Sequence, residues 1–81
     1  YEFMEAFAAL PVKFLNTYNV DNNKVNANGG HLAMGHPMGA TGAILITTLL
    51  NGLEYSNTQR GMVVAQAGGG IGAAMIIERF N

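Results

Sequence analysis

A histidine set among glycines is the feature of this sequence best suited to chemistry. His36 lies between Gly35 and Pro37, and Gly39 and Gly42 follow just where an apolar helical pattern begins. Glycines let a substrate approach the backbone closely, and the first turn of a helix offers free N–H groups and positive potential. We therefore expect His36 at the start of a helix, as a neutral base. A histidine there that only hydrogen-bonds local backbone is the alternative.

Two glycine patterns have the spacing of nucleotide-binding loops but lack the residues that such loops need. Gly30 and Gly35 are spaced as in a phosphate-binding loop, yet histidine and proline follow where a lysine and a hydroxyl are required. Gly68 and Gly70 follow an apolar run, as in a dinucleotide-binding turn. The residues after them predict a strand and not the required helix. We therefore expect no nucleotide site.

The ligands that a metal centre needs are also missing from the sequence. His31 and His36 are close in the chain, but no carboxylate or thiolate is evident that would complete a coordination shell. The sequence contains no cysteine, which excludes a disulfide and a thiolate nucleophile within this chain. We expect no metal and no cofactor, and we expect His31 to be a solvated or helix-capping loop residue.

Size and composition limit what the chain can do alone. Its 81 residues allow one small domain, and 49% of them are hydrophobic while only 11% are charged. We expect residues 1–81 to form a single partial domain whose exposed apolar surface needs a partner. The net charge of −1 argues against binding nucleic acid or an anionic membrane. No signal peptide is visible and residues 43–50 are too short to span a bilayer, so we expect a cytoplasmic location, with an organelle as the alternative.

The first half of the chain predicts a helix and a short strand ahead of His36. Residues 5–18 favour a helix that begins near Ala6 or Ala8, which would place Pro11 in its first turns, where proline is tolerated. After the turn signal of residues 21–23, Val25–Asn28 is predicted to be a strand that leads into the glycine loop.

The second half predicts a helix and a strand pair. Pro37 suits the first position of a helix. The apolar face of that helix would carry Ile44, Leu45, Thr48, Leu49, Gly52 and Leu53. Residues 62–65 and 73–77 favour strands, with a sharp reversal at residues 68–70 between them. The expected fold class is α/β, with helices layered on a sheet that ends in an antiparallel strand pair.

Several blocks of residues occur together in an order and spacing typical of one family. They are Glu5-Ala6-Phe7-Ala8, Asn26-x-Asn28-Gly29-Gly30, Gly35-His36-Pro37-x-Gly39-Ala40-Thr41-Gly42, Gly68-Gly69-Gly70-x-Gly72 and Glu78-Arg79. Together these blocks resemble the thiolases, the acyl-CoA acetyltransferase family, and they cover nearly the whole chain. The resemblance implies the later part of a thiolase C-terminal domain. It also implies an N-terminal thiolase domain as partner, acyl-CoA as substrate, a homo-oligomer and a role in fatty acid metabolism.

The resemblance also implies roles for individual residues. Thiolases perform Claisen condensation or its reverse: a cysteine of the N-terminal domain carries the acyl group, a histidine activates it, and a second cysteine moves the α-proton. His36 matches that histidine. The backbone N–H of Gly68 matches a donor to an oxyanion, and Phe7 matches a ring that lines the acyl pocket.

Two positions depart from the family pattern. Gln66 stands in the place of the second cysteine, and Met4 in the place of an asparagine that holds a water. An amide has no proton-transfer equilibrium near neutral pH that would let it act as a base, and a thioether cannot hold a water as an amide does, so neither residue is expected to be functional. We expect the isolated chain to be inactive. The alternatives are a degenerate thiolase-like protein that binds acyl-CoA without condensation, and an interaction module.

Overall fold

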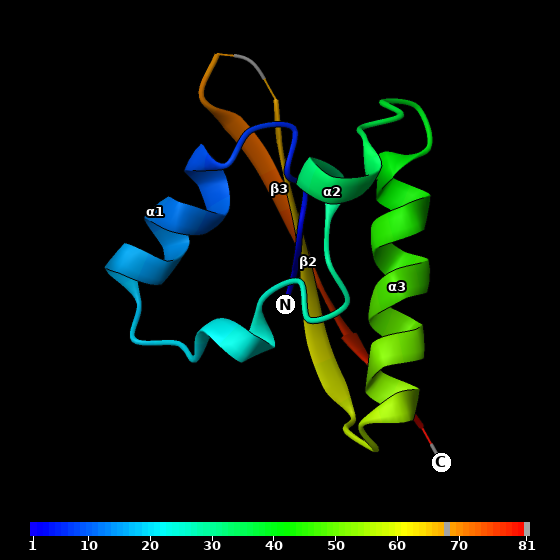
Figure 1. Cartoon of the computed structure of the whole chain (residues 1–81). Coiled ribbons are helices and arrows are strands. Elements are labelled where there is room, and N and C mark those ends of the chain that lie inside the picture. Colours follow the sequence, from blue (N-terminus) through cyan, green and yellow to red (C-terminus); the bar gives the residue numbers. More distant parts are fainter. Residues whose placement is uncertain (68, 81) are drawn as a thin grey trace.

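The computed structural model describes residues 1–67 and 69–80 and shows helices packed on a three-stranded sheet (Figure 1). The elements are β1 (Glu2–Phe3), α1 (Ala9–Thr17), the 3₁₀ turn η1 (Asn22–Lys24), α2 (His31–Met34), α3 (Thr41–Tyr55), β2 (Arg60–Ala67) and β3 (Ile71–Glu78). Strand β2 is central, with β1 parallel to it and β3 antiparallel. The predicted α/β class, with its antiparallel strand pair at the end of the chain, is confirmed.

Helix α3 covers one face of the sheet and supplies most of the core. Thr41, Leu45, Leu49 and Leu53 are its buried residues, one on each turn, as the three-and-four spacing of its apolar residues predicts. The leucines pack with Met4 and Val63. The helix ends where the side chain of Ser56 donates to the carbonyl of Gly52 at 2.8 Å and Asn57 adopts a left-handed conformation, with φ of 54°.

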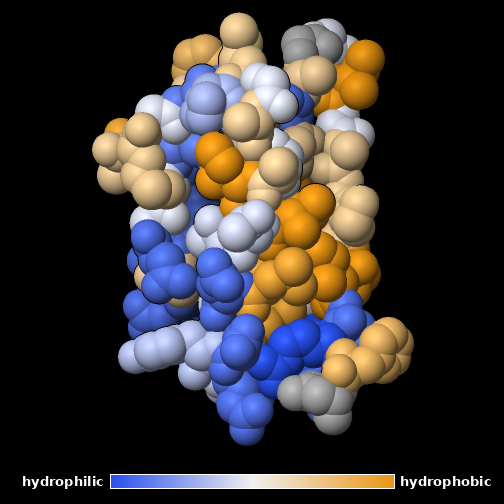
Figure 2. Space-filling model, turned by 90° about the vertical axis from the view of Figure 1, so that its right-hand side faces the viewer, coloured by the Kyte–Doolittle hydropathy of each residue, from blue (hydrophilic) through white to orange (hydrophobic). Residues whose placement is uncertain are grey.

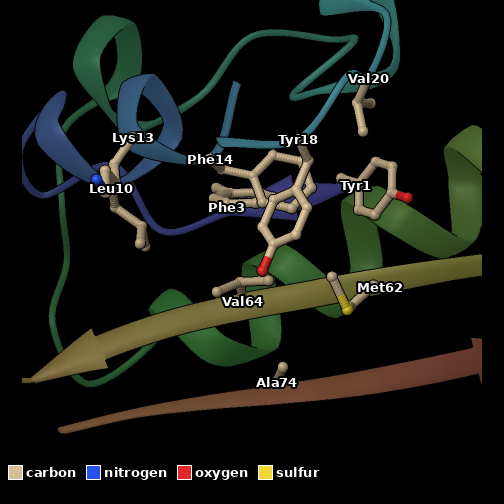
Figure 3. Close-up of a pocket in the computed structure, with 10 residues that line it drawn as sticks. All are labelled: Tyr1, Phe3, Leu10, Lys13, Phe14, Tyr18, Val20, Met62, Val64 and Ala74. Atoms are coloured by element: carbon tan, nitrogen blue, oxygen red, sulfur yellow. The ribbon is translucent and has the colours of Figure 1, made fainter. Parts of the chain in front are cut away.

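Helix α1 lies on the other side of the sheet (Figure 1). Pro11 is its third residue, where the missing N–H would have had no partner within the helix, so the predicted placement of this proline is confirmed. Figure 3 shows the rings of Tyr1, Phe3, Phe14 and Tyr18 gathered between α1 and β2. They line an open groove of about 480 Å³.

The predicted strand at Val25–Asn28 is wrong, and the side chain of Asn26 explains why. The segment begins to pair with β1, because the N–H of Asn26 donates to the carbonyl of Tyr1 at 2.9 Å. Asn26 then turns into the left-handed region, with φ of 47°. Its side chain continues the pairing, accepting from the N–H of Phe3 at 2.7 Å and donating to the carbonyl of Phe3 at 3.3 Å. One amide side chain thus replaces the next backbone unit of a neighbouring strand.

Much apolar surface remains exposed, as the composition predicts. All but one of the β3 residues are exposed, among them Ile71, Met75 and Ile76. On the face that carries α3, Figure 2 shows an apolar band with polar side chains along one flank and at its lower end. None of the helices within the described residues combines the length and the apolar character needed to cross a bilayer.

Candidate active site around His36

His36 lies before α3 and not in its first turn, so the predicted helix start at Pro37 is wrong. Residues 37–40 form a turn that is closed by the N–H of Ala40, which donates to the carbonyl of Pro37 at 2.8 Å. Helix α3 begins only at Thr41. A turn is preferred here over a helix start because the Pro37 carbonyl accepts two local hydrogen bonds, one from the Ala40 N–H and one from the Thr41 hydroxyl. His36 itself is half-buried.

A hydroxyl at the start of α3 determines which nitrogen of His36 is free. Thr41 Oγ1 lies 2.8 Å from Nδ1 of His36 and 3.1 Å from the carbonyl oxygen of Pro37. The carbonyl can only accept, so the hydroxyl proton goes to Pro37 and Nδ1 of His36 donates to Oγ1. This assignment satisfies both hydrogen bonds at once. The neutral ring then carries its proton on Nδ1 and keeps a lone pair on Nε2, which is the nitrogen able to act as a base.

His31 is buried beside His36, so its predicted place in a solvated loop is wrong. It is 5% exposed and is the first residue of α2. Its ring meets that of His36 edge to face, with centroids 5.6 Å apart and an interplanar angle of 68°. Nδ1 of His31 accepts from the N–H of Glu5 at 3.5 Å. Nε2 is buried without a hydrogen-bond partner among the described residues.

The glycine before His31 allows this burial. A Cβ on Gly30 would collide with the carboxylate of Glu5, and it would lie 2.8 Å from Nδ2 of Asn26. A side chain at position 30 would therefore require the ends of the Glu5 and Asn26 side chains to move aside. The sequence signal for this close packing was the glycine pair at residues 29–30, which we interpreted as a glycine loop and as part of the family pattern.

Met4, predicted to stand at the family's asparagine position, lies in the hydrophobic core. It is 9% exposed and clusters with Leu45, Leu49, Leu53 and Val63. Its backbone N–H donates to the carbonyl of Val64 at 2.8 Å, which continues the pairing of β1 with β2. The thioether therefore packs among leucines, where a flexible apolar side chain fits well.

Gln66, predicted to stand at the family's second cysteine position, is half-buried near the end of β2 and pairs with Gly72 of β3. Side chains alternate along a strand, so Gln66 shares a face of β2 with Val64. With Leu10 of α1, both residues line an open groove of about 590 Å³.

Phe7, the predicted acyl-pocket ring, is 71% exposed ahead of α1. Gly68, the predicted oxyanion donor, lies outside the described residues.

One buried carboxyl group on the sheet has an altered proton affinity. Glu2 on β1 is 6% exposed. Burial raises the pKa of its carboxyl from 4.5 to about 7; the charge of Glu5 adds to the rise, and the ammonium of Tyr1 opposes it. Within residues 1–67 and 69–80, no three histidine or acidic side chains group closely enough to hold a metal ion.

Comparisons with known proteins agree with the sequence blocks. Residues 1–79 match the family model described as "Thiolase, C-terminal domain". The chain is 44% identical over 80 residues to an acetyl-CoA acetyltransferase of Escherichia coli K12, covering 99% of this chain and 20% of that protein. A 3-ketoacyl-CoA thiolase of Bacillus subtilis is 41% identical over 78 residues, which are 96% of this chain and 20% of the relative.

A solved structure shows the same fold. The crystal structure of the Bacillus anthracis acetyl-CoA acetyltransferase superposes with a TM-score of 0.87 at 39% sequence identity, covering 95% of this chain and 20% of that one. The chain therefore spans about a fifth of the length of the relatives that it matches.

Proposed function

The chain belongs to the thiolase family, as part of its C-terminal domain, and on that premise we propose that the whole protein transfers acyl groups between thioesters of coenzyme A with His36 as its base. The observation that carries the proposal is the lone pair left on Nε2 of His36 when its Nδ1 donates to Thr41. A neutral imidazole with one nitrogen engaged and the other free suits proton transfer near neutral pH.

The proposed step is an acyl transfer to a cysteine that sequence outside this chain supplies. Nε2 of His36 takes the thiol proton, and the sulfur forms a bond to the carbonyl carbon of acyl-CoA. The bond from that carbon to the coenzyme A sulfur then breaks, and the leaving thiolate takes the proton back from the imidazolium. Thr41 accepts from Nδ1 throughout, so the ring keeps its orientation while its charge changes. No cofactor is needed beyond the coenzyme A thioesters themselves.

Condensation requires a second base, and here the chain departs from its family. Gln66 cannot exchange a proton with substrate, and the packing of Met4 among leucines supports a core role for that residue. A positioned base contributes about 10²–10⁴-fold and an oxyanion donor about 10²–10³-fold. We therefore propose that condensation and thiolysis are slow, and that acyl transfer to the first cysteine, followed by hydrolysis or decarboxylative chemistry, is retained.

The partners follow from the same premise. We propose that an N-terminal thiolase domain covers the exposed apolar surface, that the whole protein is a homo-oligomer with acyl-CoA as substrate, and that it acts in the cytoplasm. The 81 residues alone would be inactive, because they contain no cysteine to accept the acyl group. A pure interaction module is the second candidate, favoured by the exposed side chains of β3.

The test measures three activities of the whole protein: acyl-enzyme formation from acetyl-CoA by mass spectrometry, thiolysis of acetoacetyl-CoA, and condensation. His36→Asn should abolish acylation, whereas Glu54→Gln, an exposed change on α3, should leave it unchanged. Gln66→Cys should raise condensation and thiolysis. Acylation that survives His36→Asn would refute the assigned base, and condensation at ordinary thiolase rates without any change at Gln66 would refute the degenerate second site.

A further inference from the structure

We propose that His31 is a positioning residue that holds the ring of His36 by an edge-to-face contact. The proposal rests on the proposed function, because it concerns the orientation of the same base. The centroids of the two rings lie 5.6 Å apart and the ring planes make an angle of 68°, within the range of a favourable aromatic contact. His31 touches the reacting groups only through His36.

Polar bonding does not account for the burial of His31. Its one hydrogen bond, from the N–H of Glu5, is long at 3.5 Å, and its Nε2 is buried without a partner among the described residues. A buried imidazole with one unsatisfied nitrogen is unfavourable unless other contacts compensate. The flat face and edge of the ring provide such contacts, and one of them is with His36.

The contact with His31 limits how far the ring of His36 can move. Nδ1 of His36 is held by Thr41 at the start of α3. The ring of His36 also packs against that of His31, which is buried beside the segment that follows β1. A hydrogen bond and a ring contact together restrict the imidazole more than the hydrogen bond alone. Without the second contact, His36 would pivot about its bond to Thr41.

Two substitutions separate the ring contact from the hydrogen bond. His31→Phe keeps a flat ring and removes the acceptor for Glu5, whereas His31→Asn keeps an acceptor near the place of Nδ1 and removes the ring. In the whole protein, we expect His31→Asn to lower kcat for acyl-enzyme formation by about 10- to 100-fold with little change in KM, since small misplacements of a catalytic group have costs of that size. His31→Phe should retain kcat within about threefold, a margin set by the cost of repacking a buried ring.

A spectroscopic measurement tests the same geometry without activity. With ¹⁵N- and ¹³C-labelled histidine, the whole protein should show contacts between the ring protons of His31 and His36 in nuclear Overhauser spectra. The His36 signals should stay sharp in His31→Phe, displaced only by the different ring current of a phenyl group, and they should broaden in His31→Asn, where the ring is no longer held. Rates are compared per folded molecule, from calorimetry of each variant.

Each outcome decides the proposal. Retained activity in His31→Phe together with loss in His31→Asn supports a ring contact. Equal loss in both variants, no loss in either, or the reverse order overturns it, as does the absence of ring-to-ring contacts in the unsubstituted protein. If the unsubstituted protein forms no acyl-enzyme, the proposed function fails, while the nuclear Overhauser contacts and the His36 signals still decide the role of His31.

Discussion

Removing the hydroxyl of Thr41 should weaken the preference of the neutral His36 ring for the tautomer protonated on Nδ1. Thr41→Val replaces the hydroxyl by a methyl group of similar size, so the packing at this 3% exposed position is kept. The change removes the acceptor for Nδ1 of His36 at 2.8 Å and the donor to the carbonyl of Pro37 at 3.1 Å. Thr41→Ser is the matched variant, because it keeps the hydroxyl and loses only a methyl group.

The magnitude follows from the bonds that are lost. A neutral hydrogen bond contributes about 0.5–1.5 kcal/mol net, so the preference of the His36 ring for the Nδ1–H form should fall by about 2- to 10-fold in Thr41→Val. The free energy of unfolding should fall by about 1–2 kcal/mol, because the carbonyl of Pro37 loses one of its two donors and the half-buried imidazole loses its partner. Thr41→Ser should cost about 1 kcal/mol for the methyl group and leave the tautomer unchanged.

The assay is ¹⁵N nuclear magnetic resonance of labelled histidine, in which protonated and unprotonated ring nitrogens have separate shifts. His36 should show a protonated Nδ1 and an unprotonated Nε2 in the unsubstituted protein and in Thr41→Ser, and a mixture in Thr41→Val. A proton found on Nε2 of His36 in the unsubstituted protein would refute the reasoning, since Thr41 would then be the donor to Nδ1. Equal spectra for the valine and serine variants would also refute it.

Two further predictions concern stability. Burial raises the pKa of Glu2 to about 7, so folding favours its protonated form, and the stabilisation that is present below about pH 4.5 is lost as the pH rises through about 7. After a discount for partial solvent screening, the loss in the free energy of unfolding is about 2 kcal/mol. Urea unfolding measured from pH 4.5 to 8 should depend less on pH in Glu2→Gln, but not in the exposed Glu54→Gln. Gly30→Ala should destabilise the fold by about 1 kcal/mol, because its Cβ must displace the ends of the Glu5 and Asn26 side chains. Gly39→Ala, with no atom within 4 Å of its Cβ, should change thermal unfolding little, and similar costs for the two alanines would contradict the packing described for Gly30.

The elements that depend on local pattern were predictable from the sequence. Helix α3 repeats its leucines at the spacing of one helix face, and β2 and β3 are apolar runs on either side of a glycine reversal, so each carries its own signal. The glycine-rich setting singled out His36 as a candidate for chemistry, and the family resemblance matched it to the family's histidine. Pro11 was placed correctly because its tolerance near a helix start is a local property of its ring.

The parts that depend on distant contacts were not predictable. Strand β1 has only two residues, and it exists because β2 pairs with it on one side and Asn26 on the other. His31 looked like a loop residue because nothing in its neighbours along the chain shows that Glu5 and His36 will enclose it. Helix α3 begins at Thr41 and not at the predicted Pro37, because residues 37–40 form a tight turn. The proline is compatible with either conformation, so it did not reveal which one forms.

Met4 and Gln66, the two predicted departures from the family pattern, differ in how readily the fold would accept another side chain in their place. Met4 is enclosed by leucines of α3, so an asparagine there would leave amide groups among apolar side chains unless the surrounding packing changed as well. Gln66 lies on an open groove beside Leu10, where a smaller side chain meets no such cost. Under the proposed function, a second base at position 66 is therefore easier to restore than an amide at position 4. The proposed step at His36 would not depend on Gln66, because Thr41 contacts that ring from the start of α3 and not from β2.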